Sequence, residues 1–433
     1  MKKSANFAVS NIFEFQNKAI AWANDWEVCC CLLHNSYPHA QYHDYETVIA
    51  VGAKDEILIQ KDSKNNAFAA LKKFQSDTNE MIFGFLSYDL KNQVEDLTSH
   101  NFDGIGFPDL FFFNPIYVIE IKKNEIIIRS EKESPDAIFE QILSKKIIQK
   151  TDNQLNIKIK PRISYPKYLQ TVRSLQEHIC AGDVYEINFC QEFFAENCVV
   201  EPLPIFFQLN EKSAAPFSAY FRLHEKYVCC ASPERFLKKE NQRLVSQPIK
   251  GTRRRGASES EDQKIANELK ISLKDRAENV MIVDLVRNDL ARCSRAGTVD
   301  VEELFGIYRF RQVQQMISTV VSELRSELDW SEALRFTFPM GSMTGAPKVM
   351  SMQLIEQYEQ TRRGLFSGAI GYVTKDGDFD FNVVIRSIFY NEKNKYLSFQ
   401  VGGAIVFDSE AEEEYAECLL KAKAMLEVLG ARI

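Results

Sequence analysis

The residues best suited to covalent chemistry lie in two short segments, 232–236 and 246–252. Lys250 stands between a proline turn and a glycine, sixteen residues after Glu234. A lysine in such an apolar, turn-bounded segment can be held neutral by desolvation, and only a neutral amine attacks carbon. We therefore predict that Lys250 is a nucleophile with a pKa below its free value of about 10.4, and that Glu234 is the matching acid.

Four carboxylates form a second chemical signal. Asp275 and Glu278 are three residues apart, as are Glu414 and Glu417, and both pairs lie in segments with helical periodicity. Each pair therefore shares one helix face, and such oxygen donors suit Mg²⁺. A solvated acidic face is the alternative. The apolar run 280–286, which follows directly, instead indicates a buried helix whose carboxylates need a partner.

Arg386 is the third signal, because it stands in the otherwise apolar segment 381–390, which predicts a strand. An arginine there must meet an anion, either a substrate carboxylate or the partner of a structural salt bridge. The glycine-rich segments 341–348 and 401–406 would let backbone amides approach an anion closely. Neither contains a phosphate-loop motif, so ordinary turns stay open as their explanation.

The elements that must position these residues follow from periodicity. Residues 1 to about 130 read mostly as strands, and the polar, proline-interrupted stretch 131–164 predicts a connection with at least one short helix. Later helices are predicted at 168–182, about 260–292 and about 410–429. Strands between them are predicted at 366–373, 381–390 and 397–406. This irregular alternation favours an α+β architecture over a doubly wound sheet.

Composition excludes several other classes of protein. The 433 residues carry a net charge of −7, which argues against general nucleic-acid or membrane-surface binding. The ten cysteines form no Cys-x-x-Cys pair, so we expect no zinc site and a reducing, cytoplasmic location. We also expect no signal peptide and no membrane span, because neither apolar pattern occurs.

Together, these segments make the sequence resemble the chorismate-utilising enzymes over nearly the whole chain. The landmarks of the catalytic part are CAGDVY at 180–185, SPERF at 232–236, DRAEN at 275–279, DLVRND at 284–289, GAPK at 345–348 and SGAIGY at 367–372. Those of the N-terminal part are CLLH at 31–34, GFLSYDL at 84–90 and APFSAY at 215–220. The resemblance implies large antiparallel sheets packed face to face with helices outside. It also implies an N-terminal region at 1–130, a connection at 131–164 and a chorismate-binding domain at 165–430.

Position 250 separates the reactions within this family. Anthranilate synthases resemble a Pro-Ile-Ala-Gly-Thr pattern, whereas the branch that forms 4-amino-4-deoxychorismate resembles the Pro-Ile-Lys-Gly-Thr found here. The resemblance implies that Lys250 attacks C2 of chorismate while Glu234 protonates the departing C4 hydroxyl, after which ammonia adds at C4 and expels the lysine. It also implies Mg²⁺ on Glu278 and Glu417, with Asp275 and Glu414 in or near its shell. The substrate-binding positions that it implies are Thr252, Thr344, Tyr372, Arg386, Gly402 and Ala404.

Three positions depart from the family pattern. Gln315 replaces a histidine, Ala404 replaces the third glycine of a turn, and Asn35 replaces a serine of the family's tryptophan pocket. The rest of that possible pocket is present as Pro216, Phe217 and Ser218.

The resemblance also bears on the nucleophile and its source. Relatives that use water resemble a pattern with lysine where this chain has Glu186, which disfavours water as the nucleophile. The sequence contains no glutaminase motif, so ammonia is expected from a separate glutamine amidotransferase, with the product serving 4-aminobenzoate and folate synthesis. The alternatives are an anthranilate synthase component I, an isochorismate synthase and, from another class, a non-catalytic chorismate-binding paralogue.

Overall fold

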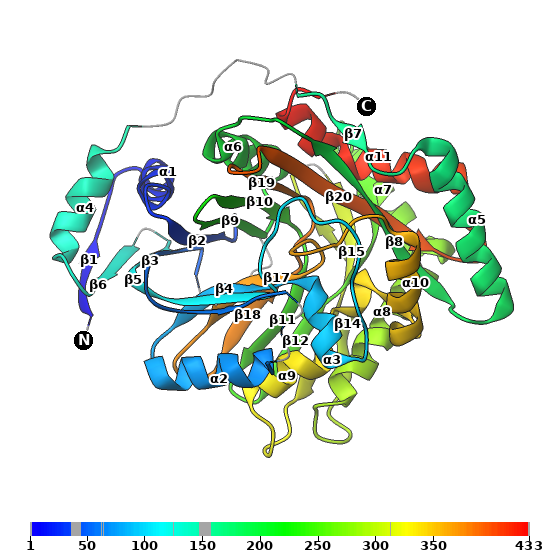
Figure 1. Cartoon of the computed structure of the whole chain (residues 1–433), viewed down its shortest axis with the longest axis horizontal. Helices are drawn as coiled ribbons and strands as arrows, with labels where there is room; N and C mark the ends of the chain where they lie inside the picture. The colour runs from blue at the N-terminus through cyan, green and yellow to red at the C-terminus, as the bar shows by residue number, and fades with distance from the viewer. Residues whose placement is uncertain are drawn as a thin grey trace.

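Two large antiparallel sheets, which share β3 (Thr47–Ile59) and β5 (Leu110–Lys122), form the centre of the protein (Figure 1). The computed structural model describes residues 2–35, 45–61, 63, 65–123, 125–146, 157–311 and 313–431. The first half of β5 pairs with β4 (Ile82–Leu86) and its second half with β6 (Glu125–Ser130). The shared strands therefore bend from one sheet into the other, and β3 has a register shift at that point.

The spatial order of strands continues from this shared pair in two directions. The first sheet consists of β1 (Lys3–Phe7), β6, β5, β3, β2 (Val28–Leu33), β9 (Phe217–Leu223), β10 (Lys226–Ser232), β19 (Ser387–Asn391), β20 (Tyr396–Ile405) and β8 (Glu186–Ala195), with β7 (Lys160–Pro161) and β16 (Gly345–Ala346) beside β8. The second consists of β3, β5, β4, β17 (Ala369–Val373), β18 (Phe379–Asn382), β11 (Arg235–Glu240), β12 (Arg243–Gln247) and β15 (Val313–Glu323), with β13 (Ile249–Arg254) and β14 (Asp300–Arg309) on β15.

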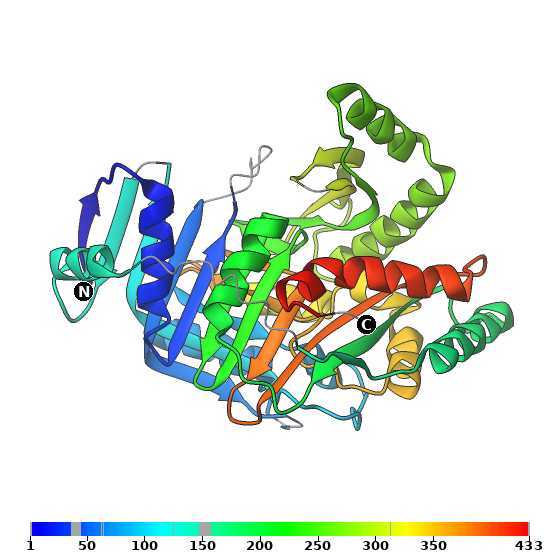
Figure 2. The same cartoon turned by 90° about the horizontal axis from the view of Figure 1, so that it is seen from above.

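Helices cover the outer faces of these sheets (Figures 1 and 2). The first sheet carries α1 (Ile12–Ala23), α4 (Pro135–Ser144), α5 (Tyr165–Ala181), α6 (Pro202–Ser213), α10 (Lys348–Tyr358) and α11 (Ala411–Val428). The second carries α2 (Ala67–Thr78), α7 (Glu259–Ile271), α8 (Leu273–Ala291) and α9 (Trp330–Thr337). The short helices are α3 (Lys91–Val94), η1 (Tyr88–Leu90) and η2 (Gly341–Met343).

Side-chain alternation along the strands divides the apolar residues between two cores. Cys29 and Cys31 on β2 pack under α1 and α6, whereas Cys30, between them, joins a core with Phe85 and Phe111. Successive side chains of a strand point to opposite faces, so a strand buried on both sides needs a continuous apolar run. The predicted α+β fold with face-to-face antiparallel sheets is confirmed.

Most predicted elements are present, but α1 and α2 interrupt the stretch that was predicted to be mostly strands, and two other predicted elements are each divided in two. The segment 260–292 forms two helices, because Ser272 ends α7 and its side chain accepts the Asp275 N–H as the N-cap of α8. The segment 381–390 is likewise broken, since β18 ends at Asn382 and β19 begins at Ser387. Arg386 therefore lies in a bend with a left-handed φ of 54°, not inside a strand. The helix predicted to stop at Gly182 does so, with that glycine in the left-handed conformation.

The N-terminal region and the catalytic region share their sheets. Strand β2 pairs with β9, and β4 pairs with β17, so strands from either side of residues 131–164 hydrogen-bond directly. The boundaries proposed from the sequence stay predictions. No helix in the described part of the chain is long and apolar enough to cross a membrane.

Candidate active site

Lys250 points out of an irregular stretch of β13 and meets a buried carboxylate. The β13–β15 ladder shifts register between Ile249 and Thr252, and such bulges re-aim side chains. The Nζ of Lys250 donates a hydrogen bond to Oε1 of Glu186 on β8, at 2.8 Å. The two side chains are only 12% and 3% exposed, so this ion pair is largely removed from water.

The expectation of a depressed pKa for Lys250 is wrong. Burial by itself lowers the pKa of this amine, but the charges of Glu186, Glu278 and Glu417 outweigh it and raise the pKa above its ordinary value. The sequence suggested the burial but not the three carboxylates, which arrive from β8, α8 and α11. The resting lysine is therefore a protonated ammonium.

Gly251 permits the bulge that aims Lys250. Its φ of 88° is left-handed, and a Cβ there would lie 3.0 Å from Oδ1 of Asp275 and 3.1 Å from Cδ1 of Leu269. We expect Gly251→Ala to lower kcat by about tenfold or more, because a displacement of about 1 Å in a reacting group is costly. Steady-state kinetics with a thermal melt test this. An unchanged kcat would show that Lys250 does not depend on the bulge.

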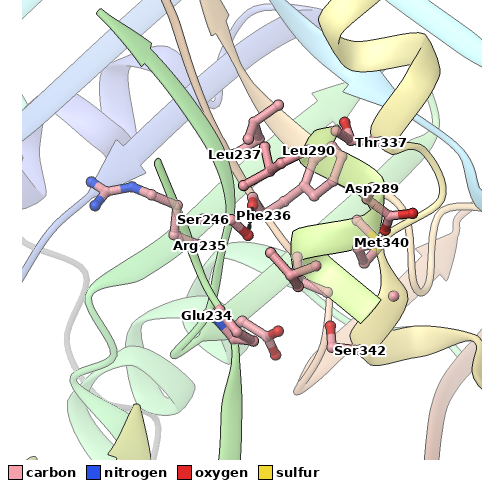
Figure 3. Close-up of a pocket in the computed structure, with 14 residues that line it drawn as sticks. Glu234, Arg235, Phe236, Leu237, Ser246, Asp289, Leu290, Thr337, Met340 and Ser342 are labelled. Carbon is pink, nitrogen blue, oxygen red and sulfur yellow. Dashed lines mark hydrogen bonds between the residues drawn. The ribbon is translucent and has the colours of Figure 1, made fainter. Parts of the chain in front are cut away.

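Glu234 precedes β11 and is 5% exposed. Figure 3 shows its carboxylate and the Ser342 hydroxyl on the same side of a pocket, while the neighbouring Arg235 points away. Burial raises the pKa of Glu234 to about 7, although a hydrogen bond from Ser342 and the charge of Lys250 partly oppose this. A carboxyl group with a pKa near 7 carries a proton that it can donate at neutral pH.

Arg386 lies in the bend that follows β18, next to Glu234. The N–H of Val383 in this bend donates to the Glu234 carbonyl at 3.0 Å. The Arg386 guanidinium makes no ion pair or hydrogen bond with the described residues, so the structural salt bridge is not formed there. Burial lowers the pKa of Arg386, and the charge of Glu417 partly restores it. This side chain is thus a half-buried cation without a bonded anion, and its role in binding substrate stays a prediction.

The four carboxylates predicted to hold a metal ion come from α8 and α11 but do not form a closed cluster. No group of three or more His, Cys, Asp or Glu side chains within the described ranges is arranged to hold an ion. Three of the four already have neighbours: Arg253 pairs with Asp275, Ser409 donates to Glu414 at 2.7 Å, and Lys421 pairs with Glu417.

Glu278 is half-buried on α8, and Glu417 is exposed on α11 beside Lys421. Burial raises the pKa of Glu278, and the negative charge of Glu417 adds to that effect, so the two carboxylates interact. Partial desolvation acts to raise the pKa of Glu417, but the positive charges of Lys421, Lys250 and Lys274 lower it overall.

The other predicted substrate-binding residues differ in their exposure to solvent. Thr252 is exposed and lies opposite Gln315, whose Nε2 donates to its hydroxyl at 3.4 Å. Thr344 is fully buried and its hydroxyl donates to the Gly341 carbonyl at 3.1 Å. The ring of Tyr372 packs in the core against Tyr45 and Phe83. Thr344 directly precedes β16, which pairs with β8 at Ile187 and Glu186. Substrate-binding roles for Thr344 and Tyr372 stay predictions.

The backbone at Gly402 and Ala404 is partly exposed on β20, and the Gly402 carbonyl accepts from Lys421 at 2.8 Å. Between them, Gly403 faces α11, since a Cβ there would lie 3.0 Å from Oε2 of Glu414. This strand therefore borders the carboxylates. A binding role for its amides stays a prediction.

The residues of the possible tryptophan pocket do lie together. Asn35 has a left-handed φ of 46°, and its Nδ2 donates to Asn210, to the Ala215 carbonyl at 2.7 Å and to the Ser218 hydroxyl at 3.1 Å. Pro216 and Phe217 contact His34, by a carbonyl hydrogen bond of 2.8 Å and a ring contact respectively. Asn35 thus uses its amide to tie these segments together.

Two residues at the site had little signal in the sequence. At position 186 the sequence shows only a departure from the water-activating relatives, because its partner Lys250 is 64 residues away. Ser342 stood in a glycine-rich segment that ordinary turns explain equally well. Both residues are found only once distant segments of the chain are brought together in the fold.

Comparison with known proteins identifies the family of the chain. The family model described as chorismate binding enzyme matches residues 29–427. The chain belongs to the chorismate-binding enzyme family. It is 32% identical over 414 residues to aminodeoxychorismate synthase component 1 of Bacillus subtilis, covering 90% of this chain and 87% of that protein. It is 35% identical over 348 residues to the protein of the same name from Escherichia coli, covering 80% and 76%.

A solved structure extends the likeness to three dimensions. Anthranilate synthase component I of Streptococcus pneumoniae aligns with a TM-score of 0.76 and 27% identity, over 87% of this chain and 91% of that one. Chorismate-binding enzymes of different activity therefore share this fold. The reaction must be argued from the site residues rather than from the fold.

Proposed function

We propose that this chorismate-binding enzyme converts chorismate and ammonia to 4-amino-4-deoxychorismate through a covalent intermediate on Lys250. The observation that carries the proposal is the buried Lys250 together with Glu234, whose pKa of about 7 suits a general acid. The names of its relatives from B. subtilis and E. coli support the same reaction.

The residues act in two displacements across the conjugated diene of the ring. In the first, the Lys250 nitrogen forms a bond to C2 while the C4–O bond breaks, and Glu234 protonates the hydroxyl so that water leaves. In the second, ammonia bonds to C4 and the C2–N bond to Lys250 breaks. Glu234, now ionised, takes the surplus proton from the new amine and is restored. Each displacement is easier than a direct exchange of hydroxyl for amine.

Arg386 and a magnesium ion complete the proposed binding site. Arg386 is a cation without a bonded partner in the described residues and suits the enolpyruvyl carboxylate. Mg²⁺ binds through one or two carboxylates plus substrate oxygens and water, so the pair Glu278 and Glu417 fits it without a third protein ligand. Bound there, Mg²⁺ would supply a charge that anchors the ring carboxylate.

Loss of either proposed ligand tests the metal site. We expect Glu278→Ala and Glu417→Ala each to reduce turnover at ordinary Mg²⁺ by about 10²-fold or more, because so few direct ligands hold the ion. Isothermal titration calorimetry of Mg²⁺ binding in the presence of chorismate measures the loss of metal affinity directly. Glu268→Ala on the exposed face of α7 is a matched control. Near-normal turnover in both site variants would mean that these carboxylates are solvated helix faces.

Ammonia is proposed to come from a separate glutamine amidotransferase. We expect the isolated chain to form aminodeoxychorismate from chorismate, Mg²⁺ and ammonium salt, and to use glutamine only when an amidotransferase is added. Product mass identifies the compound in each case. Turnover of glutamine by the isolated chain would contradict the separate partner. We further propose a cytoplasmic location and a role in 4-aminobenzoate and folate synthesis.

The alternative functions make different products in the same assay. An anthranilate synthase component I would release anthranilate and pyruvate, and an isochorismate synthase would add water. The lysine at position 250 disfavours the first, and the carboxylate at position 186 disfavours the second. A non-catalytic paralogue would turn over no chorismate.

A further inference from the structure

The carboxylate of Glu186 is fixed against Lys250 and bonded to nothing else in the described residues. Oε1 of Glu186 lies 2.8 Å from Nζ of Lys250, and Glu186 itself is 2% exposed. Its backbone is held on both sides, since β8 pairs with β16 at Ala346 and the Ser351 hydroxyl on α10 donates to the Glu186 carbonyl. The acceptor atom is thus pre-positioned on the nitrogen that the proposed reaction uses.

The proposed reaction requires a group that removes a proton from Lys250. An ammonium group has no lone pair, so Lys250 must lose a proton before its nitrogen can bond to C2. Four carboxylates interact electrostatically with Lys250: Glu186 from β8, Glu278 from α8, Glu417 from α11 and Glu234, which precedes β11. Only Glu186 is hydrogen-bonded to it, and Glu234 must keep its proton for the leaving hydroxyl.

We propose that Glu186 is a catalytic residue that accepts the proton of Lys250 as the C2–N bond forms and returns it as that bond breaks. The inference rests on the proposed covalent reaction. In the first displacement, one N–H proton moves from Lys250 to Oε1 of Glu186 and the freed electron pair bonds to C2. In the second, the departing amine recovers that proton, so Glu186 is ionised again. Glu234 separately gives one proton to the hydroxyl and takes one from the added ammonia. The sum is chorismate plus ammonia giving aminodeoxychorismate plus water.

The test compares Glu186→Gln with the wild type in single turnovers without ammonia. Glutamine keeps the size of the side chain and a hydrogen-bonding oxygen, but it cannot take a proton. Intact-protein mass spectrometry measures the formation of the chorismate adduct on Lys250. We expect the rate of adduct formation to fall by about 10²-fold, the low end of the range for general base catalysis. An adduct rate equal to that of the wild type would overturn the inference.

The pH dependence gives a readout that a structural role would not move. In the wild type the proton passes within the ion pair, so the adduct rate stays flat below the Glu234 pKa of about 7 for as long as Glu186 is ionised. In Glu186→Gln only the neutral amine reacts, and its fraction rises about tenfold per pH unit. The variant's rate should therefore climb with pH over the range where the wild-type rate is constant. A flat profile in the variant would overturn the inference.

Two further variants separate chemistry from folding. Glu186→Ala leaves space for a small carboxylate, and added acetate should restore adduct formation, whereas a folded variant that acetate does not rescue would contradict the proposal. Asp378→Asn is the control, because it breaks a comparable pair in which Nζ of Lys239 on β11 lies 2.9 Å from Oδ1 of Asp378. This variant should leave the rate of adduct formation unchanged. Absence of any adduct or product in the wild type would instead overturn the proposed function itself.

Discussion

Lys250→Ala is expected to abolish the covalent chorismate adduct and to reduce aminodeoxychorismate formation by about 10³-fold or more, as removal of a nucleophile does in other enzymes. Arg386, the carboxylates of α8 and α11, and Glu234 all remain in this variant, so chorismate binding should be largely kept. Intact-protein mass spectrometry during turnover detects the adduct, and equilibrium binding of chorismate provides the comparison.

A control must separate loss of the Lys250 nucleophile from loss of the ion pair that Lys250 forms with Glu186. Removing Lys250 leaves the buried carboxylate of Glu186 without its partner, and breaking a buried pair costs about 3–5 kcal/mol of stability. Lys250→Gln retains a hydrogen-bond donor toward Glu186 but has no nucleophilic amine. If both variants are folded and inactive, the loss belongs to chemistry. Full activity in either variant would show that Lys250 is only an electrostatic neighbour of the substrate.

Local sequence was sufficient to predict several parts of this site. The proline turn and glycine around Lys250 indicated an unusual lysine, and Gly251 does adopt the left-handed conformation that aims it. Asp275 and Glu278 share a helix, as their spacing indicated. The α+β class followed from the change of periodicity after the polar connection at 131–164. These features depend on a few consecutive residues, so the sequence alone specifies them.

The rest depends on contacts between distant segments. The protonation of Lys250 is set by carboxylates from β8, α8 and α11, and no local pattern shows that these three elements converge. Arg386 was expected within a strand because the residues around it are apolar. The chain instead bends there, where the Val383 N–H bonds to the Glu234 carbonyl rather than to a neighbouring strand. Burial can be inferred from composition, but the sign of a pKa shift requires the partners.

The last prediction concerns Glu234, the proposed acid. Glu234→Gln removes the proton donor but keeps the side chain's size, and we expect kcat to fall by about 10²–10⁴-fold. In the wild type the protonated form is the active one, and burial has raised its pKa to about 7. Activity should therefore be full below that pH and decline as pH rises through it. Steady-state rates at saturating ammonia measure this limb.

A second acidic group near Glu234 could also produce the decline of activity with rising pH, so the group responsible must be tested. Asp289 lines the same pocket, and burial raises its pKa to about 6, with Lys348 opposing the shift. A substitution at Ser342 distinguishes the two carboxyl groups, because the Ser342 hydroxyl hydrogen-bonds to Glu234 and stabilises the ionised form of that residue. Ser342→Ala should therefore raise the pKa of Glu234 and move the declining limb to higher pH, with little change in the rate below it. A limb that stays in place in Ser342→Ala but disappears in Asp289→Asn would assign the proton to Asp289 instead and remove Glu234 from the role of acid.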